Sequence, residues 1–460
     1  MSDSTRQGVT FTDAFEQPVV AVFDEASQTS DAGLLLLGAL DRRLDLTRRL
    51  CGHLSDGRAT GKVEHSLHDM LRQRVYSIAA GYADCNDART LRHDPVLRLL
   101  CDRDPVSGEA LASQPTLSRF ENSFAPREVV RASRCFETEM IARIAKHHPQ
   151  ARRVVIDLDA TEDQAHGQQR FSFFNGFYDS RCFLPLLAFI SVEGHPEQHL
   201  FHSRLRPGIG AAGRGVIPML RRAVAQIRCV LPGTRIRVRT DAGFCNPTLL
   251  RALRSLRVEY VIGLAANMVL LRRCKPFLRG LRKEVKSTGA AARRYEELRY
   301  AAKSWDSEER VVVKVEYLPP PADGGDGKIK RNIRFVVTNV KGAPKRLYET
   351  TYCGRGDSEN RIKELKHDLE LDRTSCISFV ANQLRVLMTS AAFALFQELR
   401  FELRSSELAR AQTHTLRIAL IKIGARVVRS VRRVVFHMPR ACPMAELWCT
   451  LVRTWRAVPA

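Results

Sequence analysis

From residue 151 onward, short β-branched runs alternate with stretches of helical spacing, and this order limits the possible folds more than any other feature of the sequence. The runs "ARRVVIDLDAT", "QRFSFFNGF" and "CFLPLLAFISV" are interpreted as three strands. They precede helical "GVIPMLRRAVAQIRCV", strand-like "GTRIRVRTDAGF", helical "PTLLRALRSLR" and strand-like "VEYVIGLA". Strands that alternate with helices in this way predict an α/β domain built on a mixed sheet.

The order of three strands, helix, strand, helix and strand is that of a ribonuclease H-like α/β sheet. We therefore predict that residues 151–267 form the first part of such a core and that 346–375 supply its last helix. Residues 268–345 are basic and strand-rich, and "RVVVKVEYL" and "RFVVTNV" flank the Pro/Gly-rich "PPPADGGDGKIKR", typical of an exposed hairpin loop. This part predicts an inserted β subdomain.

The two ends of the chain have a different pattern. Residues 1–150 follow helical spacing, which predicts a helical N-terminal domain that either binds DNA ends or serves as a structural bundle. Residues 376–460 predict a basic, mostly helical C-terminal region, in which 421–436 fit either a strand or a cationic helix. The apolar run at 376–396 contains Asn382, Gln383 and Arg385, and therefore predicts a packed core helix rather than a membrane span.

Charge is unevenly distributed along the chain. The net charge is +23, but residues 1–150 carry 19 Lys and Arg against 21 Asp and Glu, whereas residues 151–460 carry 54 against 29. Such an excess favours a polyanionic partner such as nucleic acid, contacted mainly after residue 150. The 12 cysteines form no C-x-x-C pair and no zinc spacing, so we expect reduced, mostly buried thiols in a soluble cytoplasmic protein with no membrane partner.

Two of the expected strands end in acids. "VVIDLDAT" supplies Asp157 and Asp159, which share one face of the strand, and "RIRVRTDAGF" supplies Asp241. Phosphodiester chemistry is commonly run by two divalent cations roughly 3.5–4 Å apart, and hard cations such as Mg²⁺ require oxygen ligands. The spacing alone does not choose between Asp157 and Asp159.

The second of these strands also carries Arg235, Arg237 and Arg239 at alternate positions. A strand whose two faces are both covered should not carry charged residues at alternate positions. Either one face is open to DNA or the strand is shorter than its pattern indicates.

A third acid lies in "YCGRGDSENRIKELK", residues 352–366. At about 100° per residue, Tyr352, Arg355, Glu359 and Lys366 share a stripe roughly 60° wide if the segment is helical. A phenol, a guanidinium and an ammonium group suited to phosphate then surround one carboxylate. Gly354, Gly356 and a capping Asp357 or Ser358 leave open a helix that begins only there.

The spacing Y-x-x-R-x-x-x-E-x-x-x-x-x-x-K, together with "DLDAT", "HGQQ" and "DAGF", resembles the DDE transposases of bacterial insertion sequences that carry the Y-R-E-K signature. Stretches such as "GYADCNDARTLRHDP", "NQLR" and "LIKIGA" are similar to the group 1 family of this class, so the resemblance extends over most of the chain.

The resemblance implies a ribonuclease H-like catalytic core with a β insertion, and cut-and-paste transposition by DNA cleavage and 3′-OH strand transfer. It implies that Asp159, Asp241 and Glu359 are the catalytic residues and the metal ligands, for two Mg²⁺ ions that Mn²⁺ can replace. By the D-x-T pattern of the family, Asp159 rather than Asp157 is the first ligand.

The resemblance also implies DNA contacts by Tyr352, Arg355 and Lys366. Related enzymes form a hairpin and place a flipped base on a Trp of the insertion, for which Trp305 is the matching residue; the alternative is a core role for Trp305. The implied partners are double-stranded DNA, as terminal inverted repeats and target, and a second copy of the chain in a synaptic homodimer. The expected location is the bacterial cytoplasm, on the nucleoid.

Two other functions are compatible with the sequence. One is a nuclease or recombinase of the same fold that cleaves without strand transfer. The other is a non-catalytic DNA-binding regulator of transposition.

Overall fold

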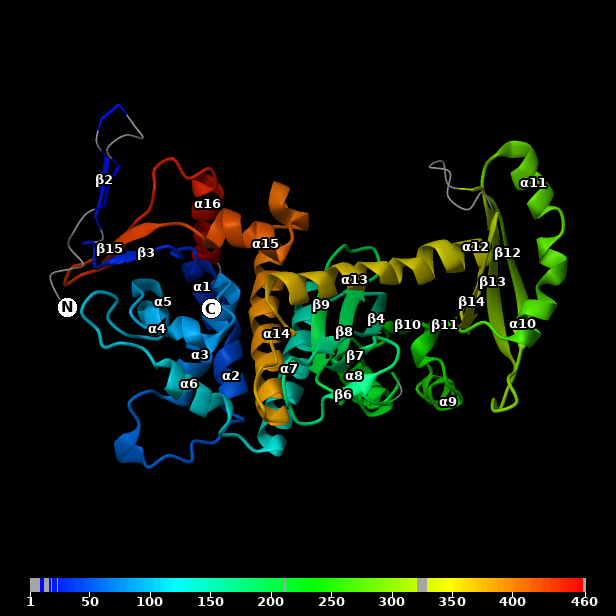
Figure 1. Ribbon diagram of the computed structural model, residues 1–460, viewed down its shortest axis with the longest axis horizontal. Helices are drawn as coiled ribbons and strands as arrows, with labels where there is room; N and C mark the ends of the chain where they lie inside the picture. Colours follow the sequence, from blue (N-terminus) through cyan, green and yellow to red (C-terminus); the bar gives the residue numbers. More distant parts are fainter. Residues whose placement is uncertain are drawn as a thin grey trace.

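A large mixed sheet forms the centre of the protein (Figure 1). The computed structural model describes residues 9–11, 16–17, 19–22, 24–210, 212–320 and 329–457 of the 460. Eight strands follow one another in the order β12-β13-β14-β11-β10-β4-β8-β9. Their bounds are β4 Arg153–Ala160, β8 Leu186–Val192, β9 Gln198–Arg204, β10 Arg235–Thr240, β11 Glu259–Leu264, β12 Ala292–Tyr300, β13 Glu309–Leu318 and β14 Lys330–Thr338.

The central three strands are parallel and their neighbours are antiparallel. β4, β10 and β11 run in one direction; helix α8 (Val216–Val230) precedes β10, and α9 (Pro247–Ser255) joins β10 to β11. β8 is antiparallel to β4, and β9 to β8. Beyond β11, the strands of 268–345 continue the same sheet through the antiparallel pair β11 and β14, so the predicted inserted strands extend the central sheet. Part of the expected hairpin loop between β13 and β14 lies outside the described residues.

Two strand assignments differ from the prediction. The run "QRFSFFNGF" contributes β6 (Phe173–Asn175), which does not join the large sheet but a small one with β5 (Asp163–Gln164) and β7 (Ser180–Phe183). The third strand of the large sheet is instead β9, whose sequence "QHLFHSR" was not recognised. β9 is rich in polar residues yet buried. Gln397 of α14 bonds its backbone, and the side chains of Gln198 and His202 bond Asp157 and Glu137.

The N-terminal part is helical as expected, and it packs on the sheet. Its helices are α1 Leu34–Leu44, α2 Leu46–Cys51, α3 Leu67–Ala80, α4 Ala88–Leu91, α5 Pro95–Leu100, α6 Gln114–Glu121 and α7 Pro126–His147. Helix α3 begins where the Ser66 side chain accepts from the N–H of Asp69 and ends at Gly81, whose φ of 94° suits glycine. One buried apolar cluster runs from these helices through the sheet.

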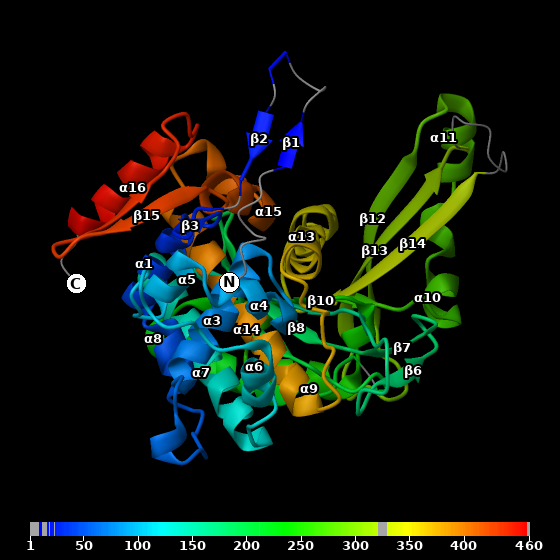
Figure 2. The same cartoon turned by 60° about the vertical axis from the view of Figure 1, so that its left-hand side comes forward.

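The C-terminal region returns to the N-terminal part (Figure 2). It comprises α14 (Phe379–Glu402), α15 (Thr413–Leu416), the antiparallel pair β15 (Ala425–Arg429) and β16 (Val434–His437), and α16 (Ala445–Ala457). β15 also pairs with β3 (Gln28–Thr29). The stretch 421–436, for which the sequence left strand and helix open, therefore forms strands at 425–429 and 434–436. A short pair, β1 (Val9–Phe11) and β2 (Val19–Ala21), precedes β3.

Helix α14 is the predicted core helix. By length and composition it could cross a membrane, but 89% of its most apolar window is buried inside the protein. It contacts α1, α3, α7 and β9. The prediction of a packed core helix is confirmed.

The segment that carries Glu359 is helical from Pro344 to Asp368, and we call residues 344–368 the Glu359 helix. It consists of α12 (Pro344–Arg346), a π turn (Leu347–Tyr352), a 3₁₀ turn (Cys353–Arg355), α13 (Gly356–Lys363) and a second π turn (Glu364–Asp368). Ser358 does not cap a helix start; its hydroxyl donates to the carbonyl of Arg355. The helix runs from beside α14 toward the strands β12–β14 (Figure 1).

All twelve cysteines, each of which lies in a described range, are free, as expected. Four of them are buried, five are partly buried and three are exposed, so fewer are buried than expected.

Candidate active site

Two of the predicted acids lie side by side at the carboxyl ends of β4 and β10. These strands are parallel, and their last paired residues are Leu158 and Thr240. Asp159 and Asp241 are the next residues, so they lie at the same level on neighbouring strands. The carboxylate of Asp241 accepts from the N–H of Gly243 at 2.9 Å, which fixes the turn after β10.

The Glu359 helix brings the third acid to this edge. Arg355 donates to the Asp159 carboxylate at 2.7 Å and to the Glu359 carboxylate at 3.1 Å. A single guanidinium therefore links the end of β4 to the helix. Glu359 remains more than half exposed, whereas Asp159 is buried.

The environment of Asp159 disfavours its charge. Burial raises the pKa of Asp159 to about 6, since water no longer stabilises the carboxylate. The guanidinium of Arg355 opposes this rise, and the charges of Asp241 and Glu359 add to it. Three acids thus interact at one edge of the sheet, and one of them holds its proton to an unusually high pH.

Tyr352 lies at the same edge, packed against the end of β11. A Cβ placed on Gly263 would lie 2.6 Å from the Tyr352 hydroxyl and 2.7 Å from the backbone nitrogen of Ala242. Glycine at 263 therefore lets the helix approach the sheet closely. Burial raises the pKa of Tyr352, so this phenol stays neutral and can donate a hydrogen bond.

Asp157 has a different environment from Asp159. It is fully buried and bonds Arg239 at 2.6 and 2.7 Å and the amide of Gln198 at 2.8 Å. Arg239 also donates to the carbonyl of Thr351 in the Glu359 helix. Asp157 is therefore a buried partner of Arg239 rather than a group open to substrate.

This pairing accounts for the alternating arginines of β10. Arg237 is also buried and bonds Glu259 and Glu193, whereas Arg235 is exposed. The strand spans Arg235–Thr240 and is covered. Neither an open face nor a shortened strand is needed, because each buried guanidinium has an acid partner.

Two residues expected to contact DNA do not face the acids. Lys366 donates to the carbonyl of Glu162 at 2.9 Å and lies 3.4 Å from the Asp372 carboxylate. The second π turn takes an extra residue per turn, which shifts Lys366 away from the stripe calculated for a regular α-helix.

Trp305 lies in the turn between β12 and β13. The strand registers place this turn near the amino end of β11, at the opposite edge of the sheet from Asp241. Trp305 packs against the apolar core and contacts Tyr300 edge to face at 5.4 Å. Trp305 is partly buried against the core and lies away from the acids, which favours the alternative of a core role; its role as the base-accepting residue stays a prediction.

Sequence reasoning missed an aromatic turn, residues 173–178, beside the acids. It comprises β6 and the turn that leads to β7, and β7 pairs with β5, only a few residues beyond Asp159. Phe174 is 62% exposed and Phe177 is 87% exposed. Burial and the charges of Asp159, Glu162 and Asp241 raise the pKa of Tyr178, which lies close to the acidic edge. The signal was the aromatic run "RFSFFNGFY", which was interpreted only as a strand.

The comparison with family models decides the classification of the chain. The model described as "Transposase DDE domain group 1" matches residues 11–459. The chain belongs to this transposase family. A search of curated proteins found no match. Among solved structures, one similar chain is a piggyBac transposase from a cryo-EM synaptic complex with hairpin DNA. The two sequences are 11% identical and the TM-score is 0.43. The match covers 86% of this chain and 83% of that chain.

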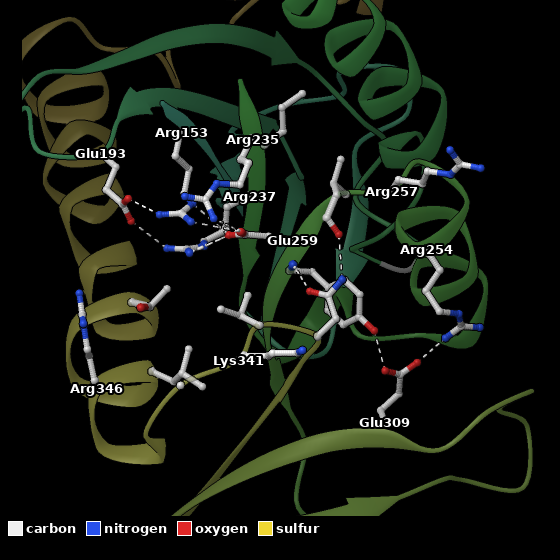
Figure 3. A pocket seen from close by; sticks show the side chains of 18 of the residues that line it. Arg153, Glu193, Arg235, Arg237, Arg254, Arg257, Glu259, Glu309, Lys341 and Arg346 are labelled. Carbon is white, nitrogen blue, oxygen red and sulfur yellow. Dashed lines mark hydrogen bonds and ion pairs between the residues drawn. The ribbon is translucent and has the colours of Figure 1, made fainter. Parts of the chain in front are cut away.

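This DDE-family chain also has a basic cavity of about 1080 Å³ at the amino ends of β10 and β11, far from the acids (Figure 3). Eight Lys or Arg and four Glu line it. Figure 3 shows Arg153 and Arg237 paired with Glu193 and Glu259, and Arg254 paired with Glu309. Within the described residues, Arg257, Lys341 and Arg346 have no acidic partner within 4.0 Å, so the cavity keeps a positive surplus.

Proposed function

We propose that the protein is a DNA transposase of a bacterial insertion sequence, in the Y-R-E-K branch, that moves its element by cut-and-paste transposition. The observation that carries this proposal is the meeting of Asp159, Asp241 and Glu359 at one edge of the sheet, where Arg355 bonds Asp159 and Glu359. Membership of a DDE transposase family supports it.

The sheet supports a ribonuclease H-like core within this proposal. The order β9-β8-β4-β10-β11, with the first two connections antiparallel and the last strands parallel, contains the predicted order of three strands followed by two helix-strand units. The two aspartates follow the first and fourth strands of that core. The Glu359 helix then lies across the carboxyl edge and contributes the last acid.

The donor set fits two Mg²⁺ ions, with Mn²⁺ as a substitute, because three carboxylates supply hard oxygen ligands. When bound by Asp159, Asp241 and Glu359, such ions would activate the attacking oxygen and stabilise the leaving oxygen at the scissile phosphate. Within the described residues, the oxygens of these acids do not all lie within 4.8 Å of one another. Arg355 stands between Asp159 and Glu359, so cation binding requires this guanidinium to release at least one of them.

The residues around the acids suit a DNA strand. Arg355, once released from a carboxylate, presents two N–H groups to a phosphate. The neutral Tyr352 hydroxyl lies beside the Asp241 turn and can donate to a phosphate oxygen. In place of Trp305, we assign the stacking of an unpaired base to Phe174 and Phe177, since exposed rings close to the acids offer the surface that base stacking needs.

The partners follow from the charge and from the reaction. The surplus of Lys and Arg after residue 150 supports binding to terminal inverted repeats and target DNA on the bacterial nucleoid. Two element ends must be cut together, so we propose that a homodimer holds them.

The decisive experiment incubates the full chain with Mg²⁺ and a labelled DNA end of the element that encodes it. Wild type is compared with Glu359→Gln and with a matched control, Asp357→Asn, an exposed acid on the same helix. We expect Glu359→Gln to lower the cleavage rate more than about 100-fold while Asp357→Asn leaves it nearly unchanged. Equal cleavage by wild type and Glu359→Gln would contradict the site.

A joining assay on pre-cut ends separates a transposase from the other two functions. Strand transfer of the 3′-OH ends into target DNA supports transposition. Cleavage without joining would favour a nuclease or recombinase, and DNA binding without either reaction would favour a regulator.

A further inference from the structure

A second cluster of metal-binding side chains lies outside the acidic site. His148, His195 and Glu197 each offer one ligand atom, and these atoms all lie within 4.8 Å of one another. The two imidazole rings are 4.2 Å apart between centroids, with their planes tilted by 55°. It is the one group of three or more His, Cys, Asp or Glu gathered this closely in the part of the chain that the structure describes.

The cluster is formed by the end of one helix and one short turn between two strands. His148 ends helix α7, where its N–H bonds the carbonyl of Ile144 at 2.9 Å. His195 and Glu197 belong to the turn between β8 and β9, in which the His195 N–H bonds the carbonyl of Val192 at 3.0 Å. Gly194, with φ of 92°, and Pro196 restrict the backbone of this turn. The three side chains therefore meet without depending on a long loop.

One polar atom of the cluster lacks a hydrogen-bond partner. The Oε2 oxygen of Glu197 is buried and has no hydrogen-bond partner among the described residues. A buried carboxylate oxygen without a partner is costly, and a cation at this position would stabilise it.

We propose that His148, His195 and Glu197 bind a divalent transition metal such as Zn²⁺. Two imidazoles and one carboxylate are the ligands that Zn²⁺ accepts, and they leave a fourth position for water or another ligand. The bound ion would join the end of α7 to the β8–β9 turn and so fix the N-terminal helices on the sheet. The site differs in ligand chemistry from the three carboxylates assigned to Mg²⁺.

The two sites are also separated in space. Val192, just before the β8–β9 turn, pairs with Val154 near the amino end of β4, whereas Asp159 is at the carboxyl end of that strand. Metal binding at the histidine cluster can therefore be measured independently of DNA cleavage.

The test uses the metal-free full chain titrated with Zn²⁺ by calorimetry and with Co²⁺ by visible absorption. With excess Mg²⁺ present to occupy the three carboxylates, we expect one tight equivalent to bind, with the absorption of tetrahedral Co²⁺, and a rise in melting temperature on adding Zn²⁺. His195→Ala and Glu197→Gln should each lower the affinity at least about 10-fold, while the exposed control His437→Ala should not.

Asp159→Asn serves as the second control and should bind Zn²⁺ as wild type does. Circular dichroism of His195→Ala checks that the fold is retained; if it is not, Glu197→Gln alone decides. Equal affinity of wild type and the cluster variants would overturn the proposal. So would a sulfur-to-cobalt charge-transfer band, because it would place the ion on cysteines instead.

Discussion

Asp157 and Asp159 are two residues apart in one strand, and their partners give them different roles. Asp157 faces a guanidinium and an amide inside the protein, whereas Asp159 faces two other acids at the edge of the sheet. The spacing in the sequence could not choose between them. The choice depends on Arg239, which is 82 residues away along the chain.

Asp157→Asn should destabilise the protein by roughly 3–5 kcal/mol, because it leaves the buried charge of Arg239 without its partner. Urea unfolding of wild type and variant measures the difference. The exposed Asp357→Asn is the control and should change the free energy of unfolding by less than about 0.5 kcal/mol. A value for Asp157→Asn as small as that of the control would show that Arg239 finds another partner.

The raised pKa of Asp159 predicts a pH effect in the absence of metal. The native carboxyl keeps its proton up to about pH 6, whereas the unfolded one loses it near 3.8. Since the native state then binds more protons, the stability contributed by this group falls as pH rises through 6. Between pH 5 and 7.5, wild type should lose roughly 1.4 kcal/mol relative to Asp159→Asn.

Denaturant unfolding of both proteins at the two pH values, in EDTA, checks this expectation. The comparison with Asp159→Asn cancels other titrating groups, and adding Mg²⁺ should remove the loss in wild type. A constant difference between the two proteins would mean that Asp159 is already charged at pH 5.

At the scale of the element, the Glu359 helix shows which side chains helical periodicity can place and which it cannot. The stripe of Tyr352, Arg355 and Glu359 could be predicted from a spacing of 100° per residue, and these three residues do lie at the acidic edge. Lys366 could not be placed this way, because the π turns change the number of residues per turn. One of the two glycines that suggested a helix start has another explanation: a Cβ on Gly354 would lie 2.7 Å from the Arg239 guanidinium, whereas one on Gly356 would meet nothing within 4 Å.

Gly263→Ala tests the close approach of this helix to β11. The added methyl group would meet the Ala242 backbone and the Tyr352 hydroxyl, so the helix must shift. We expect a loss of about 1–3 kcal/mol in stability and a lower cleavage rate in Mg²⁺. Gly57→Ala, where nothing lies within 4 Å of the new Cβ, is the matched control. If Gly263→Ala cleaves and unfolds like that control, the helix is not held as tightly as the structure indicates.

The aromatic turn makes a prediction that depends on the proposed function. With 2-aminopurine placed next to the cleavage position, binding of wild type should quench its fluorescence as the base stacks on a ring. The double change Phe174→Ala and Phe177→Ala should abolish most of the quenching, whereas Trp305→Phe should leave it unchanged. Binding of the same DNA is measured by anisotropy in EDTA, so a loss of stacking is distinguished from a loss of binding. Quenching that depends on Trp305 alone would support the assignment of the stacked base to Trp305 instead.

At the scale of the whole molecule, local patterns predicted most of the sheet but not the way its parts join. The strands that end in Asp159 and Asp241 were evident from apolar runs followed by an acid. Strand β9 was missed because it carries polar residues and yet is buried, with its backbone bonded by Gln397 of α14, nearly two hundred residues later. The pairing of β3 with β15 likewise depends on contacts between the two ends of the chain, which no short window of sequence contains.

The basic cavity of Figure 3 leads to a prediction about the whole molecule's binding to DNA. Lys341 and Arg346 line it without an acidic partner within the described residues, so they are available to phosphates. The double change Lys341→Glu and Arg346→Glu should weaken DNA binding and reduce the slope of log affinity against log salt by about 2, one for each lost phosphate contact.

The matched control for this charge reversal is Arg89→Glu with Lys62→Glu, two exposed cations of the N-terminal part that alter the net charge equally. Anisotropy titrations at several salt concentrations, in EDTA to prevent cleavage, give the affinity and the slope. If the DNA binds to the positively charged surface of residues 151–460, the control pair should change the slope of log affinity against log salt by much less. Equal changes in both pairs would mean that DNA responds only to net charge, and a change confined to the control would place the contact on the N-terminal helices.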